Sequence, residues 1–234
     1  EYDFALVLHH IAADGESLAP LFADLGAYYA HHAAQTPISL PSLEIQFADF
    51  AIWQHRALGS TEHAGSVVAE QLSYWTARLG GLPDVLGLPT DRQRPAVASH
   101  RGGRVEFSIP ASLGERVLEA ANSSGATPFM VLHGALAVLL ARLSASTDIA
   151  IATPIAGRGR RALDPLVGMF VNTLVLRTEI DPGMSFETLL QRIREIDLDA
   201  FAHSDVPFEE VVEALSPTRS AAFASLAQVM LSFD

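Results

Sequence analysis

Apolar and polar residues alternate along this chain with the periods of short strands and helices. Residues Phe4–Leu8 are continuously apolar and end at a pair of histidines, which predicts a buried strand that delivers polar groups to a sheet edge. After a polar turn, Ser17 is suited to cap a helix. One face of that helix is apolar, and its residues are Leu18, Leu21, Phe22, Leu25 and Tyr29. The beginning of the chain therefore predicts a strand, a tight turn and a helix.

The same periodicity predicts further elements of both types. The expected helices cover 47–58, 67–79, 112–121, 128–143, 185–202 and a short segment after Pro207, and the expected strands cover 104–109, 148–153, 170–180 and 228–233. A segment rich in glycine and proline, 80–95, reads as a linker. Helices and strands alternate without a short repeat, so the predicted fold class is α/β or α+β, with helices packed on a sheet.

The composition of the chain indicates a globular protein. With 234 residues, 49% of them hydrophobic, the chain can bury a sizeable core. The longest apolar run, Phe129–Leu140, is interrupted by a histidine and a glycine and is too short to cross a bilayer. The first residues carry no basic segment typical of a signal peptide. We therefore expect a cytoplasmic enzyme without a membrane span.

Residue usage excludes several kinds of chemistry. The chain has no cysteine, and all 15 of its basic residues are arginine, so thiol catalysis, disulfides, thiolate metal sites and Schiff bases have no residue to form them. A net charge of −12 argues against a nucleic-acid partner, because phosphate binding needs a concentrated basic face. The short cluster 158–161 is too small for such a face and is predicted to be a solvated or ion-paired loop.

The stretch His9-His10-Ile11-Ala12-Ala13-Asp14-Gly15 is the strongest candidate for a chemical site. A neutral imidazole can accept the proton of an attacking amine or hydroxyl, which contributes about 10²- to 10⁴-fold in rate. Gly15 allows a sharp turn and a close approach of the backbone to a ligand. The same residues could form part of a metal site, although no third ligand is nearby, or an ordinary polar turn. The residues alone leave these alternatives open.

This stretch resembles the HHxxxDG motif of nonribosomal peptide synthetase condensation domains, and further motifs of that family follow in order. The segments 74–79 and 88–95 resemble YWxxxL and LPxDRxRP, and 167–174 is similar to GxFVNT. The segment 203–209 resembles HxDxPFE, and Arg219 with 228–230 resembles the two ends of RxxxxxPLFQVM. In that last motif, Ser225 and Ala227 depart from the family's proline and phenylalanine.

The resemblance implies a chloramphenicol acetyltransferase-like fold of two lobes with the active site in a channel between them. Earlier motifs of the family, SxAQxRLW and RHExLRT, do not occur in this chain, and its C-terminal end lies short of a full domain. We therefore expect a partial domain, with 1–88 as the rear of the first lobe and 89–234 as most of the second.

The resemblance also implies roles for individual residues. His10 would be catalytic, His9 and Asp14 would support it, and Gly15 would be the close-approach residue. In the family pattern this aspartate pairs with an arginine, for which Arg158 is the candidate.

Two residues are expected at the substrate channel, Asn172 and Arg158, although a hydrogen bond at a strand edge explains Asn172 equally well. Other side chains in or near the motifs are expected to be structural; these are Tyr74, Trp75, Phe208, His203 and His133.

For function, the resemblance implies amide formation between a donor aminoacyl or peptidyl thioester and an acceptor aminoacyl thioester. The partners would be two carrier proteins, which supply the phosphopantetheine arm, and the adenylation domain of the same synthetase; no intrinsic cofactor or metal is implied. Residues 11–17 are more similar to variants that accept a D-configured donor. The alternatives are a catalytically silent interaction module and an epimerisation domain. By itself this fragment is expected to be inactive and to self-associate.

Overall fold

In a computed structural model, which describes residues 3–35, 37–218 and 220–233, the chain forms two compact units. The first comprises Glu1–Val68 with Ile155–Asn172, and the second comprises Ala69–Pro154 with Thr173–Asp234. The expected lobes, 1–88 and 89–234, divide the chain at a different place and refer to a larger domain, so that boundary stays a prediction.

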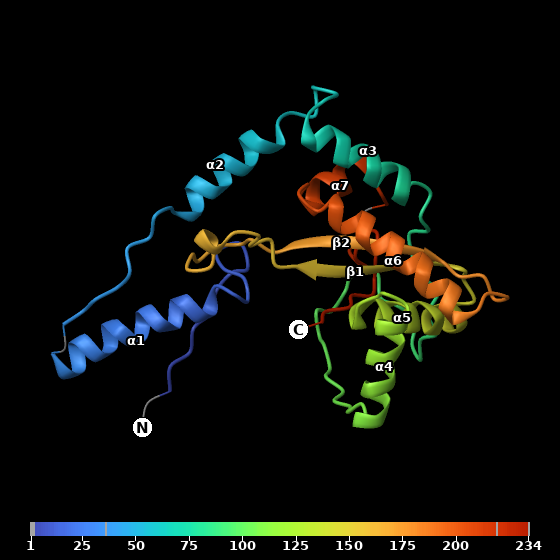
Figure 1. Cartoon of the computed structure of the whole chain (residues 1–234), viewed down its shortest axis with the longest axis horizontal. Helices are drawn as coiled ribbons and strands as arrows, with labels where there is room; N and C mark the ends of the chain where they lie inside the picture. The colour runs from blue at the N-terminus through green and yellow to red at the C-terminus, as the bar shows by residue number, and fades with distance from the viewer. Residues whose placement is uncertain (1–2, 36, 219, 234) are drawn as a thin grey trace. The chain divides into compact units, whose positions relative to one another are not determined.

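The second unit is built on two strands covered by two helices. Strands β1 (Asp148–Ile155) and β2 (Asn172–Glu179) form one sheet, and the Ile180 N–H donates to Thr147 O where β1 begins and β2 ends. This pairing makes the two strands antiparallel. Helices α5 (Pro128–Ser144) and α6 (Phe186–Ala202) run beside them (Figure 1). Their contact with the sheet forms the core, whose fully buried members include Ala137, Ile149, Ile151, Leu190 and Ile193.

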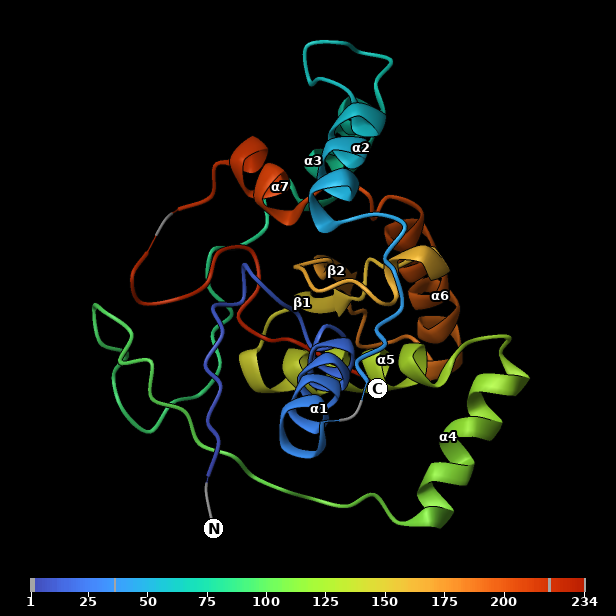
Figure 2. The same ribbon diagram turned by 90° about the vertical axis from the view of Figure 1, so that its left-hand side faces the viewer.

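The residues just before α5 and α6 explain where these two helices begin. Thr127 accepts a hydrogen bond from the Met130 N–H at the start of α5, and Ser185 accepts one from Thr188 N–H at the start of α6. Both are the short polar residues that satisfy a free amide at a helix N-terminus. Helix α4 (Ala111–Ser123) precedes α5, and the two helices are bent by 106° relative to each other. Figure 2 shows both helices.

Among the described residues, no single helix combines the length and the apolarity needed to cross a membrane. The bent pair of α4 and α5 reaches the required length and apolar composition only when the two helices are taken together.

The buried polar residue His133 is structural, as its sequence context predicted. It lies on α5 with none of its side chain exposed, 3.0 Å from Asp197 Oδ1 of α6, and its Nε2 is 3.4 Å from the Thr178 hydroxyl of β2. These contacts join the two helices to the sheet, because a buried polar group is stable only where it has hydrogen-bonding partners.

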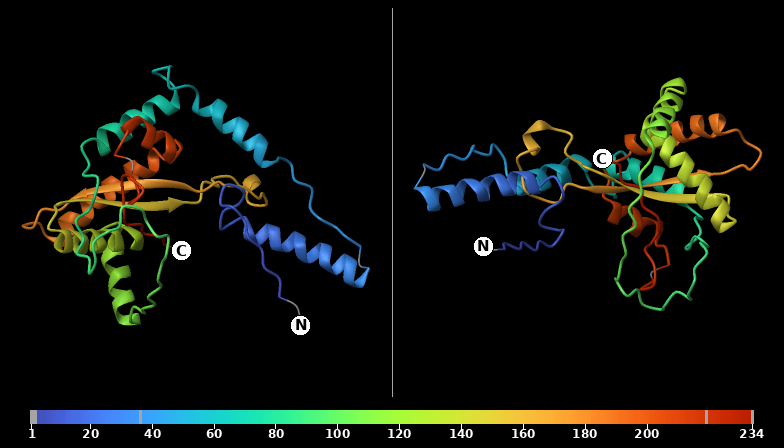
Figure 3. Two further views of the ribbon diagram at one scale, coloured as in Figure 1. Left: turned by 180° about the vertical axis from the view of Figure 1, so that it is seen from behind. Right: turned by 90° about the horizontal axis from the view of Figure 1, so that it is seen from below.

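Helices α3 (Val67–Leu79) and α7 (Phe208–Leu215) lie side by side in Figure 3. Gln71 of α3 binds the residues just before α7: its amide oxygen accepts from the N–H groups of Asp205 and Val206, and its Nε2 donates to the Asp205 carboxylate at 2.8 Å. Trp75 is buried and donates to His203 O, and the ring of Tyr74 stacks on His203 at 3.8 Å. Several residues of the YWxxxL and HxDxPFE motifs thus pack against each other.

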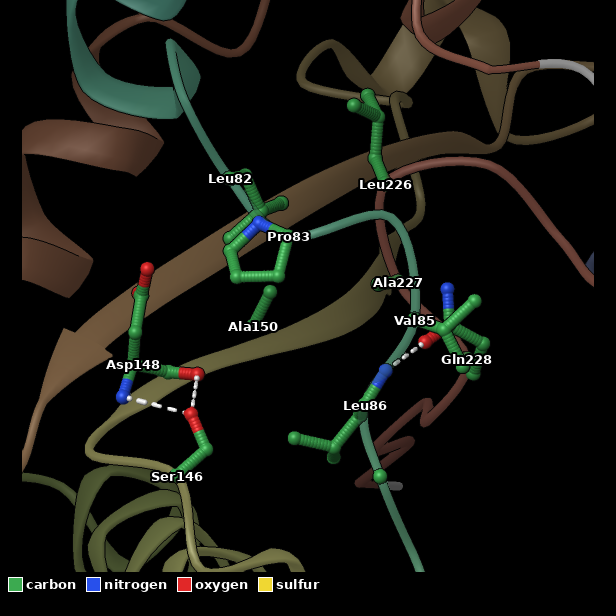
Figure 4. A pocket seen from close by; sticks show the side chains of 11 residues that line it. Leu82, Pro83, Val85, Leu86, Ser146, Asp148, Ala150, Leu226, Ala227 and Gln228 are labelled. Carbon is green, nitrogen blue, oxygen red and sulfur yellow. Dashed lines mark hydrogen bonds between the residues drawn. The ribbon is translucent and has the colours of Figure 1, made fainter.

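The predicted linker is irregular, and one of the side chains that hold it is Gln228. Gln228 accepts from the Leu86 N–H at 2.8 Å and donates to Asp84 O, on one side of a small cavity of about 40 Å³ (Figure 4). The other end of its motif, Arg219, lies outside the described residues. Gln228 fastens the linker beside β1.

The first unit contains α1 (Leu18–Ala34), α2 (Phe47–Leu58) and the short 3₁₀ helix η1 (Arg161–Leu163). Residues 155–172 leave the sheet and pack in this unit, where Leu163, Leu166 and Phe170 are buried against Phe47 and Phe50. The ring of Phe170 lies 4.8 Å from Phe50 and 5.0 Å from Phe47. The apolar face predicted for α1 is largely exposed in the described residues, with Phe22 49% and Tyr29 74% accessible.

Three predicted strands are wrong in this structure. Residues 4–8 and 104–109 are extended but unpaired among the described residues, and Val7 and Phe107 are 92% and 83% exposed. Of 228–233, only Met230 forms a bridge, to Ala152 of β1. The apolar pattern identifies a segment suited to a sheet, but a strand forms only where a neighbouring backbone supplies hydrogen bonds.

Candidate active site

The two histidines of the HHxxxDG stretch lie in a turn at the surface of the first unit. The Ala12 N–H donates to His9 O at 2.9 Å, which closes the turn, and His9 Nδ1 accepts from the Ile11 N–H at 3.1 Å. His9 is therefore held against its own turn, whereas His10 is exposed. No hydrogen bond of the His10 side chain is described, so its exposed position is compatible with the predicted chemistry.

Immediately after this turn the chain becomes buried, and Asp14 is its central polar group. One carboxylate oxygen, Oδ1, accepts from the Ser17 N–H at 2.9 Å and from Arg158 Nη2 at 2.9 Å. The other, Oδ2, accepts from the Phe170 N–H at 3.0 Å. Asp14 is only 3% exposed. The carboxylate therefore holds residues 155–172 against the loop that carries His10.

The predicted partner of Asp14 is correct, since Arg158 forms the ion pair with a side chain that is 3% exposed. The guanidinium also donates through Nη1 to Leu163 O at 2.6 Å and to Leu166 O at 2.9 Å. It lies 4.1 Å from the centre of the Phe170 ring. Its Nε makes an ion contact of 3.3 Å with the exposed Glu16, without the geometry of a hydrogen bond.

Ser17 has a different role from the predicted one. Its side chain caps no amide of α1 and instead lies inside the network, with none of the residue exposed. The hydroxyl is 2.6 Å from Asp14 Oδ1 and 2.9 Å from Gly168 O, and it accepts from the Gly168 N–H at 3.1 Å. Serine before a helix predicts a cap, but the buried charge pair supplies stronger partners for the hydroxyl than an exposed helix amide does.

The electrostatic balance at Asp14 favours the charged carboxylate. Burial by itself raises the pKa of this carboxyl, because a low-dielectric surrounding disfavours charge. Hydrogen bonds from Ser17, Arg158 and Phe170 outweigh that effect, so the pKa of Asp14 lies below its ordinary value of 3.8. The aspartate is therefore engaged with its arginine and does not contact either imidazole through any described hydrogen bond, which differs from a triad geometry.

Sequence reasoning missed two glycines that let this network close. Gly157 has φ +67°, and a Cβ there would come 2.0 Å from Phe170 O. A Cβ on Gly168 would come 2.1 Å from the ring of Phe47. Side chains at these positions would push residues 155–172 away from their contacts. A glycine directly before Arg158 was the available signal, since a left-handed turn favours glycine.

Gly15 differs from these two glycines. Its backbone is not left-handed, and a Cβ there would meet no atom within 4 Å. The described residues thus give no folding reason for glycine at this position, and its predicted close approach to a ligand stays a prediction. Asn172 is half-buried at the start of β2, and its predicted place in a substrate channel also stays a prediction.

No group of three histidine, aspartate or glutamate side chains in the described part of the chain is arranged to hold a metal ion. Asp14, the acidic member of the stretch, is directed to Arg158, Ser17 and Phe170.

The site thus combines an exposed imidazole in a turn with a buried aspartate–arginine pair, on a scaffold of helices and sheet. Comparison with known families agrees over the whole chain: the condensation domain family matches residues 1–234, and the chain belongs to it. It is 48% identical over its full length to a probable non-canonical nonribosomal peptide synthetase, CymA, of Salinispora arenicola. It is 47% identical to a dimodular nonribosomal peptide synthase of Bacillus subtilis.

Solved structures agree with this fold. The X-domain from teicoplanin biosynthesis superposes with a TM-score of 0.89 at 34% identity, over 95% of this chain and 50% of that one. A four-domain nonribosomal peptide synthetase bound to AMP and glycine superposes with a TM-score of 0.81 at 27% identity, over 97% of this chain and 16% of that one. The chain also spans only 3% and 10% of the two synthetases named above.

Proposed function

We propose that this chain is the part of a peptide-forming condensation domain that carries its catalytic histidine. The reaction joins the amine of an acceptor aminoacyl thioester to the carbonyl of a donor aminoacyl or peptidyl thioester and releases the donor's thiol. The observation that carries the proposal is the exposed His10, in a turn whose next residues are fixed by the Asp14–Arg158 pair at 2.9 Å.

His10 acts on the proton of the reacting amine. As the amine attacks the thioester it must lose a proton, and a neutral imidazole within hydrogen-bonding distance can accept it or stabilise the charge that develops. Such a group contributes about 10²- to 10⁴-fold in rate. His9 and Asp14 act indirectly: His9 braces the turn, and Asp14 fixes the backbone after it. Gly15 leaves open space beside this turn for the thioester to approach.

The relatives named above are peptide synthetases, which supports carrier proteins as partners. Synthetases that contain this family carry their substrates on phosphopantetheine arms of carrier proteins, so the domain needs no cofactor of its own. We assign it an upstream and a downstream carrier, an adenylation domain in the same synthetase and a cytoplasmic location. A D-configured donor, inactivity of the 234-residue chain alone and its self-association stay predictions.

The test is an assay of the intact synthetase with loaded donor and acceptor carriers. His10→Ala should lower the rate of dipeptide formation at least about 100-fold. His31→Ala, which removes an imidazole from α1, serves as the matched control and should leave the rate unchanged. An unchanged rate in the His10→Ala enzyme would exclude this mechanism.

A second candidate is an interaction module without catalysis. One solved relative, the X-domain from teicoplanin biosynthesis, has been determined in a complex with OxyB, with 34% identity and a TM-score of 0.89 to this chain. A silent module would form no dipeptide even with His10 intact, so the same assay separates the two functions.

A further inference from the structure

The hydroxyl of Ser17 lies at the point where two segments of the first unit meet. It donates to Asp14 Oδ1 at 2.6 Å, because a carboxylate competes for the single proton better than the Gly168 carbonyl at 2.9 Å. It accepts from Arg158 Nη2 at 2.9 Å and from the Gly168 N–H at 3.1 Å. The one proton and both lone pairs of this hydroxyl are therefore in use, and none of the residue is exposed.

Ser17 fixes the backbone that follows His10. The Ser17 N–H also donates to Asp14 Oδ1, at 2.9 Å, so main chain and side chain of one residue hold the same carboxylate. The Asp14 N–H donates to Gly168 O at 3.2 Å. His10 lies four positions before Asp14, in the turn that the Ala12 N–H closes. The position of that turn therefore depends on where Ser17 holds Asp14.

Ser17 also fixes the segment that leads to Asn172. Its hydroxyl lies within hydrogen-bonding distance of both backbone groups of Gly168, and the Phe170 N–H donates to Asp14 Oδ2. Asn172, the residue predicted at the substrate channel, follows Phe170 by two positions and begins β2. One buried hydroxyl thus joins the approaches to two predicted site residues.

Loss of this hydroxyl would disturb both segments together. The Gly168 N–H would lose its acceptor at 3.1 Å, and Asp14 would lose its shortest hydrogen bond. A buried donor without an acceptor is unfavourable, so the two segments should move until another group meets it. A displacement of about 1 Å at a reacting group can lower a rate about 100-fold. A side chain that touches no substrate can therefore control the rate.

We propose that Ser17 is a positioning residue for peptide formation, an inference that rests on the proposed function. Its hydroxyl holds the turn of His10 against residues 168–170, and it acts through these segments because it has no exposed surface to offer a substrate. Ser17 therefore affects kcat and leaves the KM for both loaded carriers unchanged.

The first test compares Ser17→Ala with Thr127→Ala in the intact synthetase with loaded donor and acceptor carriers. Both variants remove a hydroxyl that accepts a backbone N–H, but Thr127 begins α5 in the second unit. Ser17→Ala should lower kcat about 10- to 100-fold with both KM values unchanged, whereas Thr127→Ala should leave kcat unchanged. Thermal unfolding of each variant sets an assay temperature at which both are folded. An equal kcat in the two variants would overturn the proposal.

The second test compares Ser17→Thr with Ser17→Val. The two replacements are both β-branched and nearly equal in shape, so they burden the buried site alike and differ in the hydroxyl. Ser17→Thr should retain a kcat about 10-fold or more above that of Ser17→Val. Equal kcat values for this pair, or a difference confined to KM, would contradict a positioning role.

Hydrogen exchange of the backbone amides tests the positioning without catalysis. In Ser17→Ala the amides of 12–14 and 168–170 should exchange faster than in the wild type, and those of α5 should not. Unchanged exchange in both segments, or faster exchange with an unchanged kcat, would overturn the proposal and leave the proposed function intact. Failure of the proposed function has a different signature, because His10→Ala would then form dipeptide at the rate of the wild type.

Discussion

Arg158 and Asp14 are separated by 144 positions in the sequence, yet their side chains meet at 2.9 Å, with both nearly inaccessible to solvent. The pair joins the segment after the two histidines to the segment that returns from the sheet. It therefore couples the stability of the first unit to the position of the loop that carries His10.

Removal of one member of this pair should destabilise the first unit strongly. Asp14→Ala leaves a buried guanidinium without its carboxylate, which costs about 3–5 kcal/mol in the free energy of unfolding. Asp164→Ala, which removes an exposed carboxylate from the same unit, should change it by less than about 0.5 kcal/mol. Denaturant unfolding measures both. If the two variants lose the same stability, the pair does not stabilise the unit.

The two members should also be energetically coupled. In the double variant Asp14→Ala/Arg158→Leu no charge remains buried, so the loss of stability should be smaller than the sum of the two single losses, by about 1–3 kcal/mol. A double-mutant cycle by denaturant unfolding gives this coupling energy, and strict additivity would show that the two side chains act independently.

Acid should weaken the first unit through Asp14. Because the pKa of this carboxyl is lower in the folded chain than its ordinary 3.8, its contribution to stability is fully present above that value. As the pH falls below 3.8 toward the folded pKa, the unfolded chain takes up the proton first and the contribution is lost. The free energy of unfolding, measured from about pH 5 to about pH 2, should therefore fall more steeply for the wild type than for Asp14→Asn. Parallel curves would contradict this assignment.

Substitution of two glycines in the first unit should separate an effect on stability from an effect on the reaction rate. Gly157→Ala introduces a Cβ at φ +67° and 2.0 Å from Phe170 O, so it should lower stability by more than about 1–3 kcal/mol. Gly15→Ala meets no described atom within 4 Å and should leave stability within about 0.5 kcal/mol of the wild type. In the intact synthetase, Gly15→Ala should nevertheless slow dipeptide formation if a substrate occupies the open space. Thermal unfolding and the carrier assay test the two effects, and full activity of Gly15→Ala would remove the predicted role of Gly15.

Gln71 should be the strongest polar contact between α3 and the residues just before α7. Gln71→Leu removes three hydrogen bonds to Asp205 and Val206, which should cost about 2–4 kcal/mol. Gln191→Leu, which removes one exposed hydrogen bond to Ser124 O, is the matched control and should cost less than about 1 kcal/mol. Thermal unfolding followed by circular dichroism compares them, and equal midpoints would show that Gln71 is dispensable.

The sequence by itself determined the bounds of several helices and the family of the chain. Local periodicity placed α2 and α3 at their observed bounds, and the cap at Thr127 placed the start of α5, because helix hydrogen bonds are made within the segment. The ordered motifs likewise identified the family and singled out the Asp14–Arg158 pair.

Only the tertiary structure decided which segments are strands and which glycines are indispensable. Residues 4–8 and 104–109 have the composition of strands but are unpaired among the described residues, because a strand needs hydrogen bonds from another part of the chain. The role of Ser17 likewise arises from Gly168 and Arg158, which lie more than a hundred positions away in the sequence. Glycine is needed at position 157 because the Phe170 carbonyl, on the far side of a loop, approaches it closely. Contacts of that kind follow from packing, and local sequence contains no measure of them.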